Sequence, residues 1–301
     1  MDLRALLMGL AFAAMWSSAF TSARLIVADA PPLAALSVRF LVSGLIAVGI
    51  AAALGQSWRL TREQAVGTIL FGICQNALYL GLNFVAMQTI DASLAAIIAS
   101  TMPLLVAVAA WLAFGEQLSF RGIAGLCAGF AGVALIMGTR LQGGADPVAV
   151  LLCILGVLAL TFATLALRGA SSGGNILMIV GLQMLVGSAA LFIPAALLET
   201  WSFTPSWTLL GAFVYTTLVP GLAATLVWFW LVRRIGATRA ATFHFLNPFL
   251  GVAFAALLLG EAIGWFDVVG VLIIAGGILA VQVSRQGPAD AAVSKPAPEV
   301  R

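Results

Sequence analysis

The stretches LAFGEQLSFRG at 112–122 and LLLGEAIGWFD at 257–267 each place a Gly-Glu pair directly after an apolar run. The pairs are Gly115-Glu116 and Gly260-Glu261, and they lie 145 positions apart in a chain of 301 residues. The chain has only 11 Asp and Glu residues. A pair that recurs in the same context after about half the chain indicates an internal repeat.

The same shift aligns other residues of the two halves. At 145 positions the matched pairs are Pro103 with Pro248, Leu105 with Leu250, Ala110 with Ala255, Gly125 with Gly270, and Gly132 with Gly277. At a shift of 144, Ser17 meets Thr161 and Arg24 meets Arg168, as a one-residue difference in loop length would cause. We therefore expect two copies of one unit, at residues 1–138 and 147–283.

The composition is that of a membrane protein. Hydrophobic residues make up 62% of the chain and charged residues 8%, with a mean hydropathy of +1.13. Soluble proteins carry about 25% charged residues, and no soluble domain of this size buries so much apolar surface. The net charge of +3 comes from scattered basic residues, so nucleic acid is not an expected partner. The expected partner is the lipid bilayer.

A helix needs about 20 apolar residues to cross a bilayer. Ten such runs lie between turn signals, at 4–27, 32–54, 65–87, 92–113, 119–138, 147–168, 176–198, 208–232, 238–259 and 264–283. We expect the first run to be a retained span, not a cleaved signal, because it stays apolar to Val27. The polar, Pro-rich segment 284–301 is predicted to be a disordered tail.

The basic residues of the short loops predict the orientation. Eleven fall on the N-terminal side, namely Arg4, Arg59, Arg62, Arg121, Arg168, Arg233, Arg234, Arg239, Arg285, Lys295 and Arg301. The opposite side holds Arg140 and the outer end of the first helix holds Arg24. Both termini are therefore expected in the cytoplasm.

An all-α membrane fold of two five-helix copies has a geometric consequence. Because five is odd, the second copy enters the membrane from the opposite side, so the two repeats have inverted topology. Inverted repeats are typical of secondary transporters, with the substrate site near the midplane between the halves.

Three weak motifs together give a family resemblance over residues 4–283. They are an Arg early in the second helix, in Ser37-Val38-Arg39-Phe40-Leu41, a Pro inside the fourth and ninth helices, and the Gly-Glu corner of GEQLSFRGIAGLCAGFAG. In these the chain resembles the drug/metabolite transporter superfamily, EamA type, and within it most resembles the YddG-type exporters of aromatic and other amino acids. The resemblance implies ten helices around a central cavity, alternating access and a bacterial inner-membrane location.

The third helix carries a polar stripe, with Asn76, Tyr79 and Asn83 at positions i, i+3 and i+7. Polar groups are costly in hydrocarbon, so the stripe is expected to face protein or a water-filled cavity. Hydrogen bonding between helices is the alternative. We favour a substrate-binding wall. In the eighth helix the repeat gives Trp228 as the counterpart of Asn83, either as a cavity residue or as an interfacial anchor.

The ninth helix contains Thr-Phe-His-Phe-Leu-Asn-Pro at 242–248. Pro248 is expected to bend the helix and to free a backbone carbonyl, and Asn247 beside it either bonds that carbonyl or reaches a ligand, so Asn247 is a candidate substrate-binding residue. His244 is the single histidine and a candidate substrate contact or proton carrier; its alternative is a neutral packing residue. Phe243 beside it is grouped with the candidate substrate-binding residues.

Arg39 lies about seven residues into the second helix. An intramembrane Arg is a functional candidate. We favour a structural ion pair, with Asp29 or Asp91 of the outer side as its partner.

The remaining candidates are weaker. Further substrate contacts are predicted at Trp16, Ser17, Ser100, Thr161 and Tyr215. Bending points are predicted at Pro103, Pro220 and Pro248. Glu116 and Glu261 are interpreted as structural corners at hairpins, on the cytoplasmic and outer sides respectively, rather than as catalytic carboxylates.

Elimination narrows the substrate. No acidic residue lies in the middle of a span, which disfavours a pump for permanent cations. One mid-span Arg is too few for a sugar-phosphate carrier. A cavity with aromatic, amide, hydroxyl and imidazole groups suits amino acids, aromatic and other neutral ones, exported down their gradient. The alternative is export of other small neutral or aromatic metabolites or drugs, with proton coupling through His244.

Other protein classes are disfavoured. The chain has one His, no HExxH and no Walker A sequence, so we expect neither an enzyme nor direct use of ATP. A channel is a minor alternative. No cofactor or metal is expected, and the functional unit is expected to be a monomer.

Overall fold

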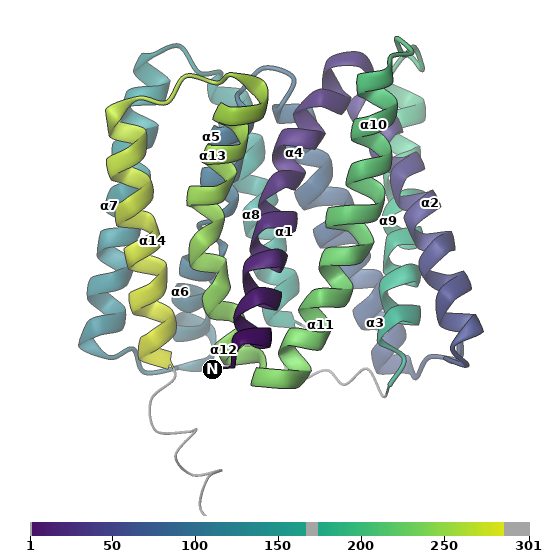
Figure 1. Ribbon diagram of the computed structural model, residues 1–301, viewed down its shortest axis with the longest axis horizontal. Coiled ribbons are helices and arrows are strands. Elements are labelled where there is room, and N and C mark those ends of the chain that lie inside the picture. The colour runs from purple at the N-terminus through teal and green to yellow at the C-terminus, as the bar shows by residue number, and fades with distance from the viewer. Residues whose placement is uncertain (1, 167–173, 286–301) are drawn as a thin grey trace, which may run out of the picture.

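A computed structural model describes residues 2–166 and 174–285 of the chain. It is a bundle of ten membrane-length helical spans, and no strand occurs in these residues (Figure 1). The ten spans coincide with the ten apolar runs to within a few residues, so the predicted all-α membrane fold is confirmed. The predicted disordered tail, residues 284–301, falls almost entirely outside the described residues, as does the end of the sixth run at 167–168.

Six spans are single helices and four are interrupted. The single helices are α1 (Leu3–Asp29), α2 (Pro32–Ala53), α7 (Phe120–Gln142), α8 (Pro147–Ala166), α9 (Ile176–Leu198) and α14 (Trp265–Arg285). The third span is α3 (Arg62–Phe71), η1 (Gly72–Tyr79) and α4 (Leu80–Ala86), and the fourth is α5 (Ala92–Ala99) and α6 (Met102–Phe114). The eighth is α10 (Trp207–Thr216), η2 (Thr217–Ala223) and α11 (Ala224–Ile235), and the ninth is α12 (Ala237–Ala241), η3 (Thr242–Leu246) and α13 (Asn247–Leu259).

The helix interruptions occur at equivalent positions in the two repeats. The third and eighth spans both widen into a π-helix, η1 and η2, whose first residues Gly72 and Thr217 are 145 positions apart. The fourth and ninth spans are both broken just before a proline, Pro103 at the start of α6 and Pro248 at the start of α13. Because a π-turn or a proline leaves backbone groups without their helical partners, polar backbone gathers in the same two places of each half.

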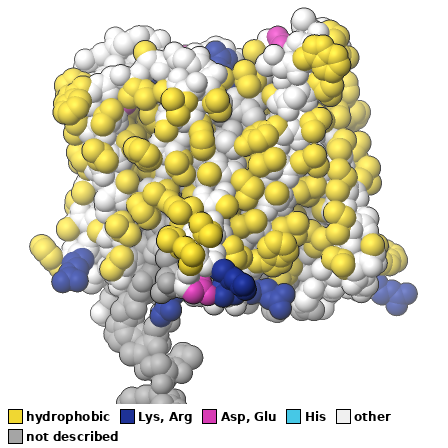
Figure 2. All heavy atoms as spheres, in the orientation of Figure 1, with side chains coloured by type: hydrophobic (Ala, Val, Ile, Leu, Met, Phe, Trp, Pro, Cys, Tyr) yellow, Lys and Arg dark blue, Asp and Glu magenta, His cyan; other side chains and the backbone are white. Residues whose placement is uncertain are grey.

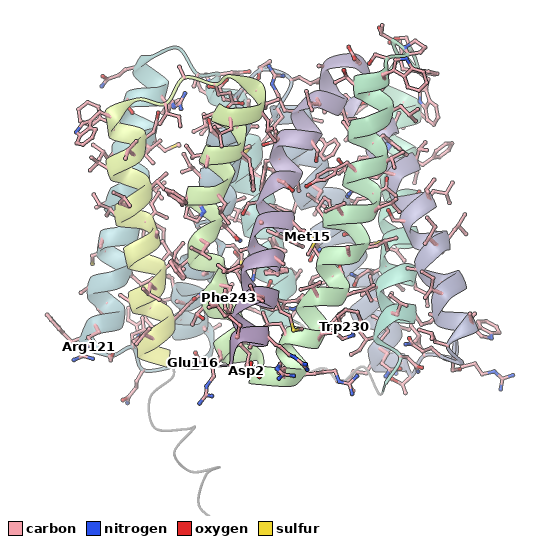
Figure 3. All side chains as sticks on the ribbon, viewed as in Figure 1. Asp2, Met15, Glu116, Arg121, Trp230 and Phe243 are labelled. Carbon is pink, nitrogen blue, oxygen red and sulfur yellow. The ribbon has the colours of Figure 1, made fainter. Side chains whose placement is uncertain are left out.

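The Gly-Glu pairs end α6 and α13 in the same conformation. Gly115 and Gly260 close the two helices with φ of 63° and 69°, a left-handed geometry that favours glycine. Glu261 then turns back, and its two carboxylate oxygens accept hydrogen bonds from the backbone amides of Ala92 and Ser93 at 2.7 and 3.0 Å. It thereby caps the first turn of α5. Glu116 lies at the opposite end of the bundle, the one that carries the N-terminus (Figure 3).

The two halves pack around a pseudo-two-fold axis. A Cβ on Gly125 of α7 would lie 2.8 Å from the carbonyl oxygen of Gly277, and one on Gly132 would lie 2.8 Å from that of Gly270, both on α14. Since Gly125 and Gly132 are the repeat counterparts of Gly270 and Gly277, each contact is the image of the other. α2 and α9 pair through Ser37 and Ser188, whose hydroxyls each donate to the other's carbonyl oxygen at 2.9 and 2.8 Å.

The outer surface fits a bilayer. Hydrophobic side chains cover the face of the bundle shown in Figure 2, and basic ones gather there at the end that holds the N-terminus. Six of the eight tryptophans are exposed in loops or toward helix ends, as at membrane interfaces: Trp58, Trp111, Trp201, Trp207, Trp230 and Trp265. The other two, Trp16 and Trp228, lie inside the bundle and lead to the candidate site.

Candidate functional site

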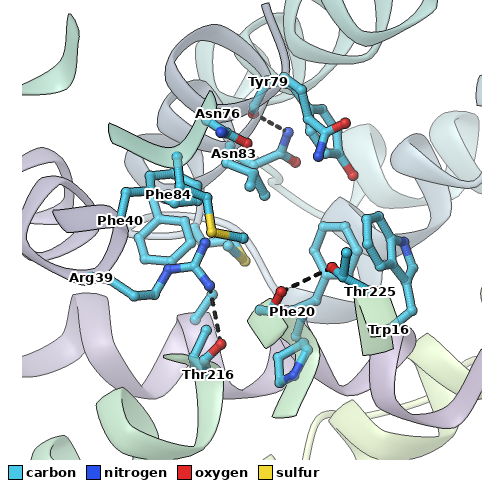
Figure 4. Close-up of a pocket in the computed structure, with 18 of the residues that line it drawn as sticks. Trp16, Phe20, Arg39, Phe40, Asn76, Tyr79, Asn83, Phe84, Thr216 and Thr225 are labelled. Carbon is cyan, nitrogen blue, oxygen red and sulfur yellow. Dashed lines mark hydrogen bonds between the residues drawn. The ribbon is translucent and has the colours of Figure 1, made fainter. Parts of the chain in front are cut away.

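A cavity of about 80 Å³ lies among α1, α2, α9 and the interrupted third and eighth spans (Figure 4). Both π-helices contribute to its wall. Its lining is mixed, with aromatic rings, amides, hydroxyls and one guanidinium: Trp16, Ala19, Phe20, Ala23, Arg39, Phe40, Gln75, Asn76, Tyr79, Leu80, Asn83, Phe84, Met87, Gln183, Met184, Thr216, Pro220, Gly221 and Thr225. The lining contains no Asp or Glu among the described residues.

The polar stripe of the third span faces this cavity. The Asn76 amide donates a hydrogen bond to the carbonyl oxygen of Gln183 at 2.9 Å, and this bond joins η1 to α9. Asn83 donates to the carbonyl oxygen of Tyr79 at 2.7 Å, while its own buried Oδ1 has no hydrogen-bond partner in the part of the chain described. An acceptor oxygen without a donor is costly when buried, and it is available to a ligand.

Arg39 lines the same cavity, and the ion pair predicted for it is wrong. Asp91 pairs with Arg140 at 3.0 Å, and Asp29 accepts a hydrogen bond from Ser206. Arg39 instead donates from Nη1 to the carbonyl oxygen of Thr216 at 3.1 Å (Figure 4). The sequence pattern could not predict the Thr216 partner of Arg39, because it does not show that Asp29 and Asp91 bond to other residues near helix ends.

A second cavity, of about 30 Å³, lies on the other side of three shared rings. Trp16, Phe20 and Tyr79 line both cavities and therefore separate them. The second cavity is also lined by Ser17, Ala96, Ala99, Ser100, Met102, Pro103, Leu160, His244 and Asn247. It thus lies against the breaks of the fourth and ninth spans.

His244 belongs to a hydrogen-bonded chain in this second cavity. Ser17 Oγ donates to Asn247 Oδ1 at 3.4 Å, and the Asn247 amide nitrogen lies 2.9 Å from His244 Nδ1. Because an amide nitrogen donates, Nδ1 is the accepting nitrogen, which the neutral ring with its proton on Nε2 provides. This geometry fits a neutral, positioned imidazole. Its role in proton movement stays a prediction.

An aromatic layer closes the bundle between the cavities and the N-terminal end. The Phe12 ring lies 4.7 Å from Trp228 and 5.3 Å from His244, and Trp228 lies 5.2 Å from His244. Nearer that end, a Cβ on Gly9 would meet the Phe243 ring at 2.2 Å, and Asp2 is paired with Arg234 (Figure 3). α1 is therefore packed tightly onto the eighth and ninth spans on this side.

Four predicted substrate contacts do not reach either cavity. Thr161 donates to the Val157 carbonyl oxygen of its own helix, and the Tyr215 hydroxyl is 2.8 Å from Ser18 Oγ. Trp228 and Phe243 belong to the closing layers just described. The other eight line one cavity or both: Trp16, Ser17, Asn76, Tyr79, Asn83, Ser100, His244 and Asn247.

Several lining residues were missed by the sequence analysis. Gln75 and Gln183 are polar residues inside apolar runs, a signal as good as that of the asparagines. Phe20 and Phe40 carry no such signal, since most phenylalanines in such a chain face lipid or other helices. No group of three or more His, Cys, Asp or Glu residues suited to a metal ion occurs within residues 2–166 and 174–285.

Ten spans in two inverted halves, with broken helices around a central polar cavity, define a multi-pass membrane transporter. Comparison with protein families identifies the transporter family. The model of the EamA-like transporter family matches residues 3–138 and 147–282, nearly the whole chain in two consecutive copies. The chain belongs to this family, within the drug/metabolite transporter superfamily.

Relatives with full-length similarity are transporters without a stated substrate. The chain is 26% identical to "Uncharacterized transporter YvbV" of Bacillus subtilis, over 93% of this chain and 92% of the relative. It is 25% identical to "Uncharacterized inner membrane transporter YedA" of Escherichia coli K12, over 90% and 88%. A solved structure titled "Crystal structure of protein" shares the fold, with a TM-score of 0.68, 19% identity and coverage of 95% of this chain and all of that one.

Proposed function

We propose that this transporter exports amino acids, aromatic and other neutral ones, across the bacterial inner membrane by alternating access, as the YddG-type exporters do. The observation that carries the proposal is the lining of the first cavity. It combines aromatic rings with four amide side chains, Gln75 and Asn76 on η1, Asn83 on α4 and Gln183 on α9, and includes no acidic side chain among the described residues. Rings suit an apolar or aromatic side chain, and the amides and free backbone groups suit the charged ends of a zwitterion.

The excluded substrates support the same class. A permanent organic cation gains most from a buried carboxylate, and the described lining has none. A phosphate ester needs several cationic or amide donors, and Arg39 is the single cation of this lining. A small molecule with one positive and one negative end fits these limits.

The proposed orientation in the membrane is the one that the positive-inside rule favours. Both termini are placed in the cytoplasm because basic residues concentrate at the N-terminal end of the bundle (Figure 2). The E. coli relative, which is named an inner membrane transporter, supports the same membrane for this chain. The proposed unit is the monomer, since the two halves of one chain already enclose both cavities.

Facilitated diffusion is the proposed mode of transport. No acidic side chain lines either cavity in the described residues, so a carboxylate proton relay has no site there. Coupling through His244 is the second mode. This second mode is supported by the position of His244 in the second cavity, which only the rings of Trp16, Phe20 and Tyr79 separate from the first.

Counterflow tests the proposal. Proteoliposomes loaded with an unlabelled amino acid are given a trace of the same labelled compound outside, across a panel of amino acids, with and without a pH gradient. We expect transient accumulation of neutral and aromatic amino acids without a gradient. Absence of exchange for every amino acid would refute the substrate class, and accumulation that requires the gradient would favour coupling through His244.

A further inference from the structure

Arg39 is a buried cation for which the described residues supply no counter-ion. It is 5% exposed, and the ion pairs described in the structure use other arginines, Arg140 and Arg234. Its guanidinium carbon lies 4.4 Å from the centre of the Phe40 ring. Within the described residues its one hydrogen bond is to Thr216, and its buried Nε has no partner.

The Thr216 bond has a local explanation. Pro220 has no N–H and cannot bond the carbonyl oxygen four residues before it, which is that of Thr216. In the π-helix η2 the backbone partner of this carbonyl is the N–H five residues on, that of Gly221, and Nη1 of Arg39 adds a side-chain donor that ties α2 to the start of η2. A guanidinium has five N–H donors, so this role uses one of them.

Residues 2–166 and 174–285 contain no acidic side chain that balances the remaining charge. Arg stays protonated in proteins, and burying an unpaired ion is strongly unfavourable. Stacking on the Phe40 ring offsets only part of this cost. A purely structural tie to a carbonyl needs a hydrogen bond, not a full positive charge on the wall of a cavity.

We propose that Arg39 binds the carboxylate of the transported molecule, so that the cavity accepts small organic acids and zwitterions and rejects their amides, esters and amines. The inference rests on the proposed transport function and narrows its substrate class. A carboxylate matches the planar fork of a guanidinium, and in a dry cavity such a charge-assisted pair is strong. The single cation suits a single carboxylate.

The test compares ligands that differ at one group. Purified protein is titrated with L-phenylalanine, L-phenylalaninamide and 3-phenylpropanoate, and binding is followed by thermal stability and by inhibition of counterflow. Wild-type protein is expected to bind the first and third and to bind the amide at least about tenfold more weakly, the size of a hydrogen bond to a charged group. Chloride is titrated separately, with gluconate as its control.

The variants separate charge from structure. Arg39→Gln keeps an amide donor for the Thr216 carbonyl and removes the charge, and Arg39→Lys keeps the charge without the fork. We expect Arg39→Gln to lose the preference for the acid over its amide, and Arg39→Lys to keep it with weaker binding. Arg24→Gln is the matched control, because Arg24 donates to the carbonyls of Met87 and Gln88 and lines neither cavity.

Each outcome decides one of the two proposals. If phenylalanine and its amide bind equally, or Arg39→Gln keeps the wild-type preference, the role of Arg39 is refuted and amino-acid export stands. If 3-phenylpropanoate binds through Arg39 but no amino acid is exchanged, amino-acid export is refuted and the carboxylate site stands. Stabilisation by chloride alone, equal to that by the acids, means an adventitious ion only and refutes the site. If Arg39→Gln does not fold, the wild-type comparison of acid with amide decides.

Discussion

Nη1 of Arg39 donates to the carbonyl oxygen of Thr216 at 3.1 Å, from α2 to the last residue of α10, directly before the π-helical stretch of the eighth span. This bond joins the first half of the chain to the second at the place where Pro220 interrupts the helix. It also fixes a charged group on the wall of the central cavity.

The amino end of a zwitterion is expected to meet Asn83. Its unpartnered Oδ1 is a buried acceptor on the cavity wall, and an ammonium group is a charged donor. Asn83→Leu should weaken binding of phenylalanine by about tenfold or more, the size of a hydrogen bond to a charged group. Binding of 3-phenylpropanoate, which has no ammonium, should change little. Equal losses for both ligands would show that Asn83 acts through the shape of the cavity.

Gly9 is expected to control closure at the N-terminal end. Its Cβ position lies 2.2 Å from the Phe243 ring, so Gly9→Ala must displace that ring and loosen α1 from the ninth span. In a cysteine-free background, a cysteine at Ser17 should react faster with an impermeant maleimide added to that side. Gly49→Ala is the control, since nothing lies within 4 Å of its Cβ position.

A second substitution sharpens this test. Shortening Phe243 to Leu in the Gly9→Ala background should restore slow labelling, because it removes the ring that the new methyl group meets. Fast labelling in wild-type protein, unchanged by Gly9→Ala, would contradict closure by this contact.

The glycine seam between α7 and α14 is expected to be intolerant of side chains. Gly132→Ala places a methyl group 2.8 Å from the Gly270 carbonyl oxygen, and such overpacking costs about 1–3 kcal/mol. The apparent melting temperature in detergent should fall. Gly138→Ala, on the same helix with open space around it, should leave the melting temperature unchanged. Equal melting temperatures for the two variants would argue against the seam.

The tie between Asp2 and Arg234 is expected to weaken only in strong acid. The hydrogen bond from Arg234 lowers the pKa of the Asp2 carboxyl from 3.8 to about 2. A lowered pKa stabilises the folded state above the ordinary value, and this contribution is lost as the pH falls from about 4 toward 2. The difference in labelling rate at a cysteine in position 17 between the Asp2 protein and its Asp2→Asn variant should therefore stay constant between pH 5 and 8 and shrink only as the pH falls below about 4.

The spans and the repeat could be predicted because their signals are local. The length of an apolar run is set by the thickness of the bilayer, and the Gly-Glu pair marks a left-handed turn at Gly115 and again at Gly260. The breaks before Pro103 and Pro248 also follow from local chemistry. None of these inferences needs to know which helices touch.

The contents of the site depend on tertiary contacts and were predicted only in part. The sequence GICQNALY, residues 72–79, does not predict a π-helix, because it contains no proline and a single sequence cannot reveal an insertion. The partner of Arg39 was missed because Asp91 is drawn to Arg140, on another helix. Thr161 is polar like its repeat counterpart Ser17, yet it bonds its own helix instead of lining a cavity.

Efflux from loaded vesicles tests the central claim most directly. Proteoliposomes filled with labelled L-phenylalanine are diluted into buffer with or without unlabelled L-phenylalanine, and the initial rate of efflux is measured against internal concentration. An alternating-access exporter of amino acids predicts a saturable rate that rises when the unlabelled compound is present outside. A rate no higher than that of protein-free vesicles, or one that grows in proportion to concentration without trans-stimulation, would contradict it.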